Sequence, residues 1–103
     1  MTSLHNKLVI ITGGSSGIGQ ALARQLAVKG AHVQIWARRE ALLQETLSTL
    51  GGEGHHAYAV VDVSKRKQVE AALESLYQQA GIPDMLINNA GITYPQYIEE
   101  IPL

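Results

Sequence analysis

The sequence predicts an α/β fold in which helices cover an open parallel sheet. Three observations carry this prediction: four short apolar runs rich in β-branched residues, three stretches of helical periodicity between them, and glycines at most of the junctions. The predicted order is therefore βαβαβαβ. Parallel neighbours cannot be joined by tight hairpins, so this alternation favours right-handed helical crossovers. A length of 103 residues with 46% hydrophobic residues suits a single domain.

The first half of the chain is expected to form two strands and two helices. Residues 8–11 (LVII) are an apolar run that predicts a strand buried on both faces. A helical stripe of apolar residues starts at Ile18, and the helix is expected to end at residues 29–30, where a basic residue precedes a glycine. Residues 33–36 predict the second strand, and leucines spaced over residues 43–50 predict the second helix.

The second half adds two strands and one helix. Residues 57–61 predict the third strand, and Ser64 is the expected N-cap of a helix whose apolar stripe runs to Ala80. The capping box is incomplete, because Lys67 stands where Glu or Gln would reach back. Residues 85–87 predict the fourth strand. Ligands bind at the carboxyl ends of the strands in such sheets, so we expect the site in the loops that follow the strands.

Charge and composition exclude several classes of function. The 8 basic and 9 acidic side chains give a net charge of -1, so neither nucleic acid nor anionic lipid is expected as a partner. The absence of cysteine excludes disulfides and thiolate metal sites, and we expect a cytoplasmic location. The run at residues 8–11 is too short to be a membrane segment. The pair His55-His56 is expected to be solvated, because neighbours on a strand point to opposite faces and nothing completes a metal site.

A glycine-rich loop, residues 12–19 (TGGSSGIG), joins the first predicted strand to the first predicted helix. Glycines in this context let the backbone turn tightly and approach a pyrophosphate, whose charge the N–H groups and dipole of the helix start attract. A plain turn is the alternative, although strand, loop and helix occur in the order that a dinucleotide site requires. A P-loop is excluded, because Gln20 and Ala21 stand where Lys and Ser or Thr must be.

Three motifs in register resemble the N-terminal half of a short-chain dehydrogenase/reductase. They are the Thr-Gly-x-x-x-Gly-x-Gly loop, Asp62-Val63 after the third predicted strand, and residues 88–91 (NNAG) after the fourth. The resemblance implies a Rossmann-type sheet truncated after the fourth strand, with residues 1–103 as the NADP-binding, N-terminal part of a longer single-domain enzyme. It also implies hydride transfer between a nicotinamide and a small-molecule ketone or secondary alcohol, and a homo-oligomer at full length.

The resemblance further implies roles for individual residues. Asp62 contacts the adenine with the Val63 backbone beside it, and residues 89–91 support the sheet and the nicotinamide ribose. The alternative, if the resemblance is set aside, is that Asp62 is simply a carboxylate in a turn and that the pair Asn88-Asn89 forms a turn. This alternative is compatible with the implied roles. The expected cofactor-binding residues are Gly13, Ser15, Ser16, Gly17, Ile18, Gly19, Arg38, Arg39, Asp62, Val63, Asn89, Ala90 and Gly91.

Charge at the end of the second predicted strand favours NADP(H) over NAD(H). An acidic side chain there would bind the ribose hydroxyls of NAD, whereas arginine favours the 2′-phosphate of NADP. Ala37 occupies the acidic position, and Arg38 and Arg39 follow it. The alternative, two solvated arginines at a helix start, is disfavoured because cations there oppose the helix dipole.

The chain does not contain the catalytic set of the family that it resembles. That set needs a serine and a tyrosine with a lysine four residues later, and no tyrosine of this sequence has such a lysine. We therefore expect the chain to be inactive alone, with a non-catalytic nucleotide-binding or regulatory module as the alternative. The stretch after Gly91 is similar to 3-ketodihydrosphingosine reductases, so the expected substrate is 3-ketosphinganine or a 3-oxoacyl compound.

Overall fold

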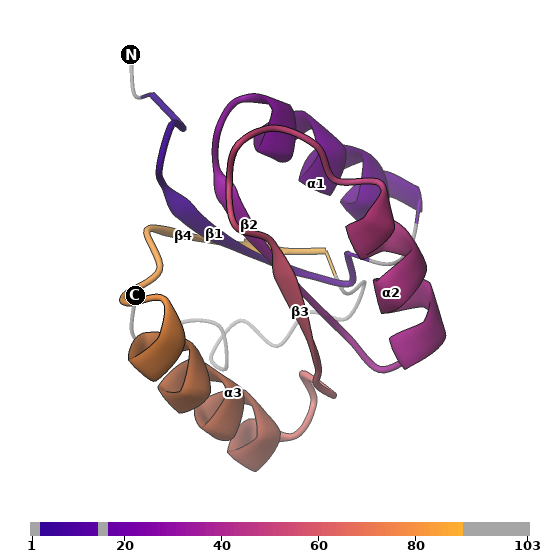
Figure 1. Cartoon of the computed structure of the whole chain (residues 1–103). Coiled ribbons are helices and arrows are strands. Elements are labelled where there is room, and N and C mark those ends of the chain that lie inside the picture. Colours follow the sequence, from indigo (N-terminus) through magenta and orange to yellow (C-terminus); the bar gives the residue numbers. More distant parts are fainter. Residues whose placement is uncertain (1–2, 15–16, 90–103) are drawn as a thin grey trace.

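The computed structural model describes residues 3–14 and 17–89, and its elements alternate as the sequence predicts (Figure 1). The strands are β1 (Leu8–Thr12), β2 (His32–Ala37), β3 (Ala57–Val60) and β4 (Met85–Asn88). The helices are α1 (Gly17–Val28), α2 (Glu40–Ser48) and α3 (Arg66–Gln79). The predicted α/β class is confirmed. None of these helices has the length and apolar character needed to cross a membrane.

Strand β1 lies inside the sheet, whose order is β3-β2-β1-β4. All pairings are parallel, and Ile10 of β1 pairs with Gln34 on one side and Leu86 on the other. Every residue of β1 is buried, as its unbroken apolar run predicts, whereas the outer strands β3 and β4 are only partly buried. Because the strands are parallel, their carboxyl ends all lie at one edge of the sheet.

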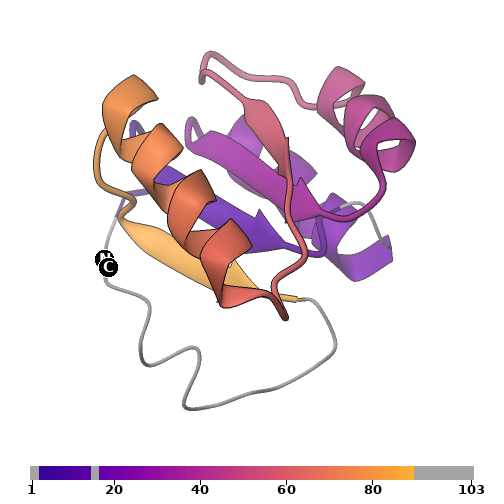
Figure 2. The same ribbon diagram turned by 90° about the horizontal axis from the view of Figure 1, so that it is seen from below.

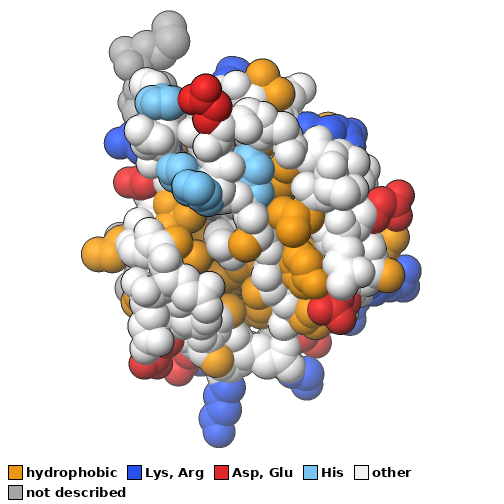
Figure 3. Space-filling view, viewed as in Figure 1, with side chains coloured by type: hydrophobic (Ala, Val, Ile, Leu, Met, Phe, Trp, Pro, Cys, Tyr) orange, Lys and Arg blue, Asp and Glu red, His pale blue; other side chains and the backbone are white. Residues whose placement is uncertain are grey.

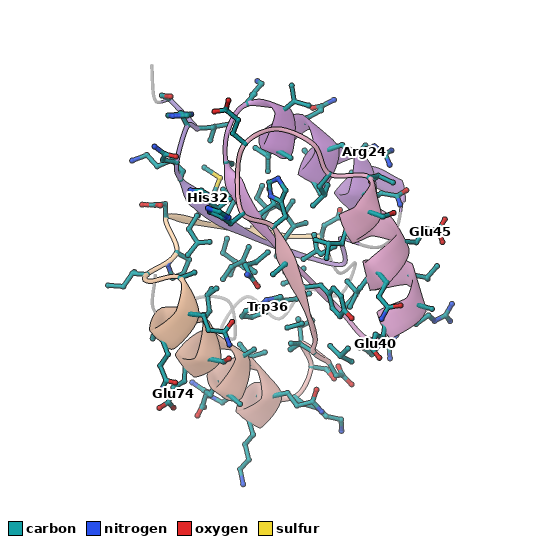
Figure 4. All side chains as sticks on the ribbon, in the orientation of Figure 1. Arg24, His32, Trp36, Glu40, Glu45 and Glu74 are labelled. Atoms are coloured by element: carbon teal, nitrogen blue, oxygen red, sulfur yellow. The ribbon has the colours of Figure 1, made fainter. Side chains whose placement is uncertain are left out.

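Two helices cover one face of the sheet, and α3 covers the other (Figure 2). Successive side chains of a strand point to opposite faces, so each strand serves two cores. Val9 and Ile11 pack in the core with α1 and α2, whereas Leu8 and Ile10 pack in the core with α3. Trp36 is buried in the second core, between the sheet and α3 (Figure 4). The loops at the carboxyl edge are therefore attached to a sheet packed on both faces.

The predicted N-cap of the third helix is wrong by one residue. Lys65, not Ser64, occupies the N-cap position of α3, and its side chain makes no capping hydrogen bond. The Ser64 hydroxyl instead donates to Oδ1 of Asp62 at 2.6 Å. Because this hydroxyl is engaged in the turn before the helix, α3 starts at Arg66 without a side-chain cap.

The apolar stripe of α1 does not start at Ile18, as the sequence pattern predicted. This side chain is 72% exposed, and the buried residues of the helix are Gly19, Ala23, Leu26 and Ala27. The close approach of Gly19 to the ends of β1 and β4 sets which side of the helix faces the sheet. Ile18 is consequently left at the surface beside the glycine loop.

The histidine pair precedes β3 instead of lying on a strand. His56 accepts the N–H of Val33 on Nδ1 at 3.1 Å and donates from Nε2 to the carbonyl oxygen of Gly51 at 2.8 Å. The N–H of His55 donates to Nδ1 of His32 at 2.8 Å, and these two rings stack. His55 is exposed, as expected, whereas His56 is half-buried with both ring nitrogens hydrogen-bonded, so the expectation of solvated histidines is wrong for His56 alone. Both histidines attach the loop before β3 to the amino end of β2, where histidine side chains gather (Figure 3).

Candidate nucleotide-binding site

The glycine loop leaves β1 through a sharp turn against β2. Gly13 has a φ of 71°, in the left-handed region that favours glycine, and its N–H donates to the carbonyl oxygen of Trp36 at 2.7 Å. A Cβ at Gly14 would lie 2.7 Å from Cγ2 of Ile35. Both glycines therefore allow the chain to pass close to the end of β2.

Gly19 makes the closest approach between α1 and the loops at this edge. A Cβ there would collide with the carbonyl oxygen of Gly13 and would lie 2.6 Å from Nδ2 of Asn89. The same Nδ2 donates a long hydrogen bond of 3.5 Å to that carbonyl oxygen. The start of α1 is thus held against the ends of β1 and β4, an approach that only glycine permits.

Thr12 joins the end of β1 to the end of β4. Its Oγ1 donates to Oδ1 of Asn88 at 2.8 Å and accepts the N–H of Asn89 at 3.1 Å. The Asn89 N–H also lies 3.1 Å from the carbonyl oxygen of Thr12. Thr12 is buried, so its hydroxyl needs these partners, and together they fix the position of Asn89.

The first turn of α1 is open on its outer side. A Cβ at Gly17 would have none of the described atoms within 4 Å, and the neighbouring Ile18 is exposed. The N–H groups of a first helical turn have no acceptor within the helix, and the helix dipole makes this end attractive to anions. The turn therefore offers N–H donors, space and an apolar side chain to a ligand that carries phosphate.

Asp62 lies in the loop after β3, at the same edge of the sheet. Its Oδ1 accepts hydrogen bonds from the N–H and the hydroxyl of Ser64, at 3.0 and 2.6 Å. These hydrogen bonds lower the pKa of the Asp62 carboxyl, and the positive charges of Arg38 and Lys65 lower it further, while partial desolvation opposes them. The carboxyl is therefore ionised at neutral pH.

Two arginines follow β2, next to the loop of Asp62. Arg38 comes directly after the strand, and Arg39 is the N-cap residue of α2. Both side chains are exposed, and within residues 3–14 and 17–89 neither one forms an ion pair. Arg38 is near enough to Asp62 for its charge to lower the pKa of that carboxyl. The end of β2 thus presents positive charge beside a carboxylate.

The structure brings the described members of the predicted site to the carboxyl edge of the sheet. These members are Gly13, Gly17, Ile18, Gly19, Arg38, Arg39, Asp62, Val63 and Asn89. The other predicted residues, Ser15, Ser16, Ala90 and Gly91, lie outside the described residues. Sequence reasoning missed Gln68, whose Oε1 accepts the N–H of Asp62 at 2.8 Å. Its only signal in the sequence is a polar side chain in the first turn of a helix that follows Asp-x-Ser.

This combination of loops has a counterpart in known proteins. A family model described as short chain dehydrogenase matches residues 7–103. The chain belongs to this family. It corresponds to the N-terminal, NAD(P)-binding portion of these oxidoreductases, with their Rossmann-like open parallel sheet.

Relatives of this chain carry the names of different enzymes. A 3-oxoacyl-acyl-carrier-protein reductase of Chlamydia trachomatis is 40% identical over 92 residues, which cover 87% of this chain and 37% of that protein. Zerumbone synthase of Zingiber zerumbet is 35% identical over 96 residues, which cover 93% of this chain and 36% of that protein. The chain thus spans little more than a third of these two relatives. A short-chain dehydrogenase/reductase homologue of Bacillus subtilis is 37% identical over 90 residues, and here the match covers 83% of the relative.

Solved structures show the same architecture. L-sorbose reductase of Gluconobacter frateurii, complexed with NADPH and L-sorbose, has a TM-score of 0.80 at 34% identity, over 98% of this chain and 40% of that one. An NAD+-bound xylitol dehydrogenase shares the fold, with a TM-score of 0.80 at 24% identity. The match covers 88% of this chain and 35% of that one. One neighbour holds NADPH and the other NAD+, so likeness of fold is compatible with either dinucleotide.

Proposed function

We propose that the carboxyl edge of the sheet binds a nicotinamide adenine dinucleotide, with the pyrophosphate at the start of α1 and the adenine beside Asp62. The observation that carries this proposal is the close approach of Gly19 to Gly13 and Asn89, which holds the open first turn of α1 at the ends of β1 and β4. A pyrophosphate fits this place, because it needs N–H donors and a backbone that no Cβ shields.

We infer from the charges that the dinucleotide is NADP(H). Ala37 ends β2 and supplies no acceptor for the ribose hydroxyls of NAD, whereas Arg38 and Arg39 offer guanidinium groups to a 2′-phosphate. Both arginines are exposed, and in the described part of the chain no acidic side chain pairs with either one. A charge-assisted contact with phosphate therefore does not require an existing ion pair to break.

For the whole protein we propose an oxidoreductase that acts on a ketone or a secondary alcohol, as a homo-oligomer. The bound nicotinamide supplies or accepts the hydride, while the residues of this chain bind and orient the dinucleotide. A 3-oxoacyl substrate is supported by the relative from Chlamydia trachomatis. The resemblance to 3-ketodihydrosphingosine reductases concerned residues 92–103, which lie outside the described residues, and the relatives above give it no support.

A nucleotide-binding or regulatory module without chemistry of its own is the second candidate. The observation in its favour is the homologue of Bacillus subtilis, of which this chain matches 83%. This relative is therefore itself little longer than the matched segment. Both candidates require dinucleotide binding, and they differ in whether a hydride is ever transferred.

Calorimetric titration of the chain with NADPH and with NADH, in low salt, tests the proposal. We expect both to bind, with NADPH tighter by about 10- to 150-fold, since one charge-assisted contact contributes about 1.5 to 3 kcal/mol. Added salt should reduce this preference, because it screens an exposed contact. Equal affinities would show that Arg38 does not bind the 2′-phosphate, and tighter binding of NADH would overturn the choice of NADP(H) as cofactor. Binding of neither would overturn the dinucleotide proposal itself.

A further inference from the structure

The turn between β3 and α3 holds Asp62 from two sides. Ser64 donates its N–H and its hydroxyl to Oδ1 of the Asp62 carboxylate, at 3.0 and 2.6 Å. Gln68, in the first turn of α3, accepts the N–H of Asp62 on Oε1 at 2.8 Å. The N–H of Lys65 donates to the carbonyl oxygen of Asp62 at 2.9 Å and closes the turn. Both the backbone and the carboxylate of Asp62 are therefore fixed.

These contacts are not those that would best stabilise the helix. Asp and Ser are preferred N-cap residues, and a side-chain cap typically stabilises a helix several-fold in its folding equilibrium. Yet Lys65 is the N-cap residue of α3 and makes no side-chain cap. The Ser64 hydroxyl is exposed and serves the carboxylate instead of a helical N–H. The turn thus uses its polar side chains to hold one carboxylate in place.

Oδ2 is the oxygen of Asp62 that remains available. Both hydrogen bonds from Ser64 go to Oδ1, and no partner of Oδ2 occurs among residues 3–14 and 17–89. The charged side chains that act on the carboxylate are Arg38, after β2, and Lys65, at the start of α3, and both are positive. A fixed, ionised carboxylate therefore presents one free acceptor oxygen at the edge of the sheet where we place the adenine.

We propose that Ser64 and Gln68 are positioning residues, which orient Asp62 so that its free Oδ2 accepts a hydrogen bond from the exocyclic amino group of the adenine. This inference rests on the proposed dinucleotide function. It assigns base specificity to the whole turn between β3 and α3, and not to the carboxylate alone. The amino group of adenine donates a hydrogen bond to a carboxylate. Hypoxanthine has a carbonyl oxygen at the same ring position, and this oxygen and the carboxylate would repel each other because both are acceptors.

The test compares ADP-ribose with IDP-ribose, which carries hypoxanthine in place of adenine. Neither probe has a 2′-phosphate, so the comparison is independent of the choice between NADP and NAD. We expect the unmodified chain to bind ADP-ribose at least about tenfold more tightly than IDP-ribose, as for a hydrogen bond to a charged acceptor. Ser64→Ala and Gln68→Ala should each reduce this ratio several-fold, mainly through weaker binding of ADP-ribose.

Two further variants separate positioning from general damage to the fold. Ser64→Thr keeps a hydroxyl and should retain the ratio. Ser75→Ala removes a hydroxyl from α3, where Ser75 Oγ accepts a hydrogen bond from Gln79 at 3.2 Å, and should leave both affinities unchanged. If Ser64→Ala melts below the measuring temperature, the Gln68→Ala and Ser64→Thr arms still decide the question.

A pH series adds a readout that a purely structural role would not move. The preference for adenine should fall as acid protonates Asp62, because a protonated carboxyl is a weaker acceptor. The hydrogen bonds of Ser64 lower the pKa of this carboxyl, so the fall should occur at higher pH in Ser64→Ala than in the unmodified chain. A preference and a pH profile that Ser64→Ala and Gln68→Ala both leave unchanged would overturn the inference. Failure of the unmodified chain to bind ADP-ribose would instead overturn the proposed function.

Discussion

Arg38 and Asp62 lie at the same edge of the sheet, each in the loop after one of two neighbouring strands, and the charge of Arg38 lowers the pKa of the Asp62 carboxyl. The guanidinium is thus within electrostatic range of the carboxylate, and the two form no ion pair in the described residues. Such an arrangement suits a ligand that carries both an anionic group and a hydrogen-bond donor. A 2′-phosphorylated adenosine has both.

Exchanging the charge at the end of β2 should reverse the cofactor preference. The double variant Ala37→Asp with Arg38→Ala adds an acceptor for the ribose hydroxyls, repels a 2′-phosphate and removes its donor. We expect NADH to bind more tightly than NADPH in this variant, as measured by calorimetry in low salt. Arg24→Ala, which removes an exposed arginine from α1, is the matched control and should keep the original preference. A double variant that still prefers NADPH would show that a cationic side chain other than Arg38 binds the 2′-phosphate.

The two glycines at the start of α1 should differ in their effects. Gly19→Ala forces a Cβ against the carbonyl oxygen of Gly13 and should lower the free energy of unfolding by about 1 to 3 kcal/mol. A Cβ introduced by Gly17→Ala has no described atom within 4 Å, so this variant should leave the free energy of unfolding unchanged or raise it by up to about 1 kcal/mol. Its new methyl group lies where the pyrophosphate is expected, so it should weaken ADP-ribose binding. Urea denaturation and calorimetry measure the two effects separately, and equal stability of both variants would contradict the packing around Gly19.

The outer edge of β4 should make the chain self-associate. Met85 is 39% exposed on a strand that is paired on one side only among the described strands, and such edges pair readily with other chains. Met85→Lys should shift the chain toward monomer in size-exclusion chromatography with light scattering. Val28→Lys changes an equally apolar but helical surface position and should not. An unmodified chain that stays monomeric at high concentration would contradict this prediction.

The chain alone should not transfer a hydride. Dinucleotide binding orients the nicotinamide, but reduction of a ketone also needs a proton donor, and no tyrosine of the sequence has the lysine partner that the family uses. With a panel of ketones, NADPH oxidation should not exceed the rate without protein, whereas an intact 3-oxoacyl reductase serves as positive control. Ketone-dependent oxidation that follows the chain through purification and is lost in Gly19→Ala would contradict this expectation.

The strand and helix order was predictable because each element carries its own local signal. The apolar run of β1 and the glycine that follows it identify a buried strand and its end without any knowledge of neighbours. The sequence motifs predicted which loops form the site. They did not predict the hydrogen bonds of Ser64 and Gln68 that hold Asp62. Ser64 looked like a helix cap because its residue type suits one, but the carboxylate of Asp62 competes for the same hydroxyl.

Ile18 and the histidines show the same limit. The stripe pattern assigned Ile18 to the core. How α1 faces the sheet is instead determined by the contact of Gly19 with Gly13 and with Asn89, which is distant in sequence. His56 looked solvated because no periodicity marks a side chain that accepts a backbone N–H from another strand. Contacts of this kind depend on the tertiary arrangement, and a single sequence contains no direct signal for them.

The central place of β1 also matters while the chain is being synthesised. Among the described elements β1 emerges first from the ribosome and its partner β4 emerges last, and the N–H of Leu8 depends on the Asp84 carboxylate for its 2.8 Å hydrogen bond. A nascent chain that has reached only α3 therefore carries a mostly apolar strand, β1, with one unpaired side. Pairing between such distant segments is slow compared with local helix formation. Until β4 arrives, that side of β1 is where a chaperone or another nascent chain would bind.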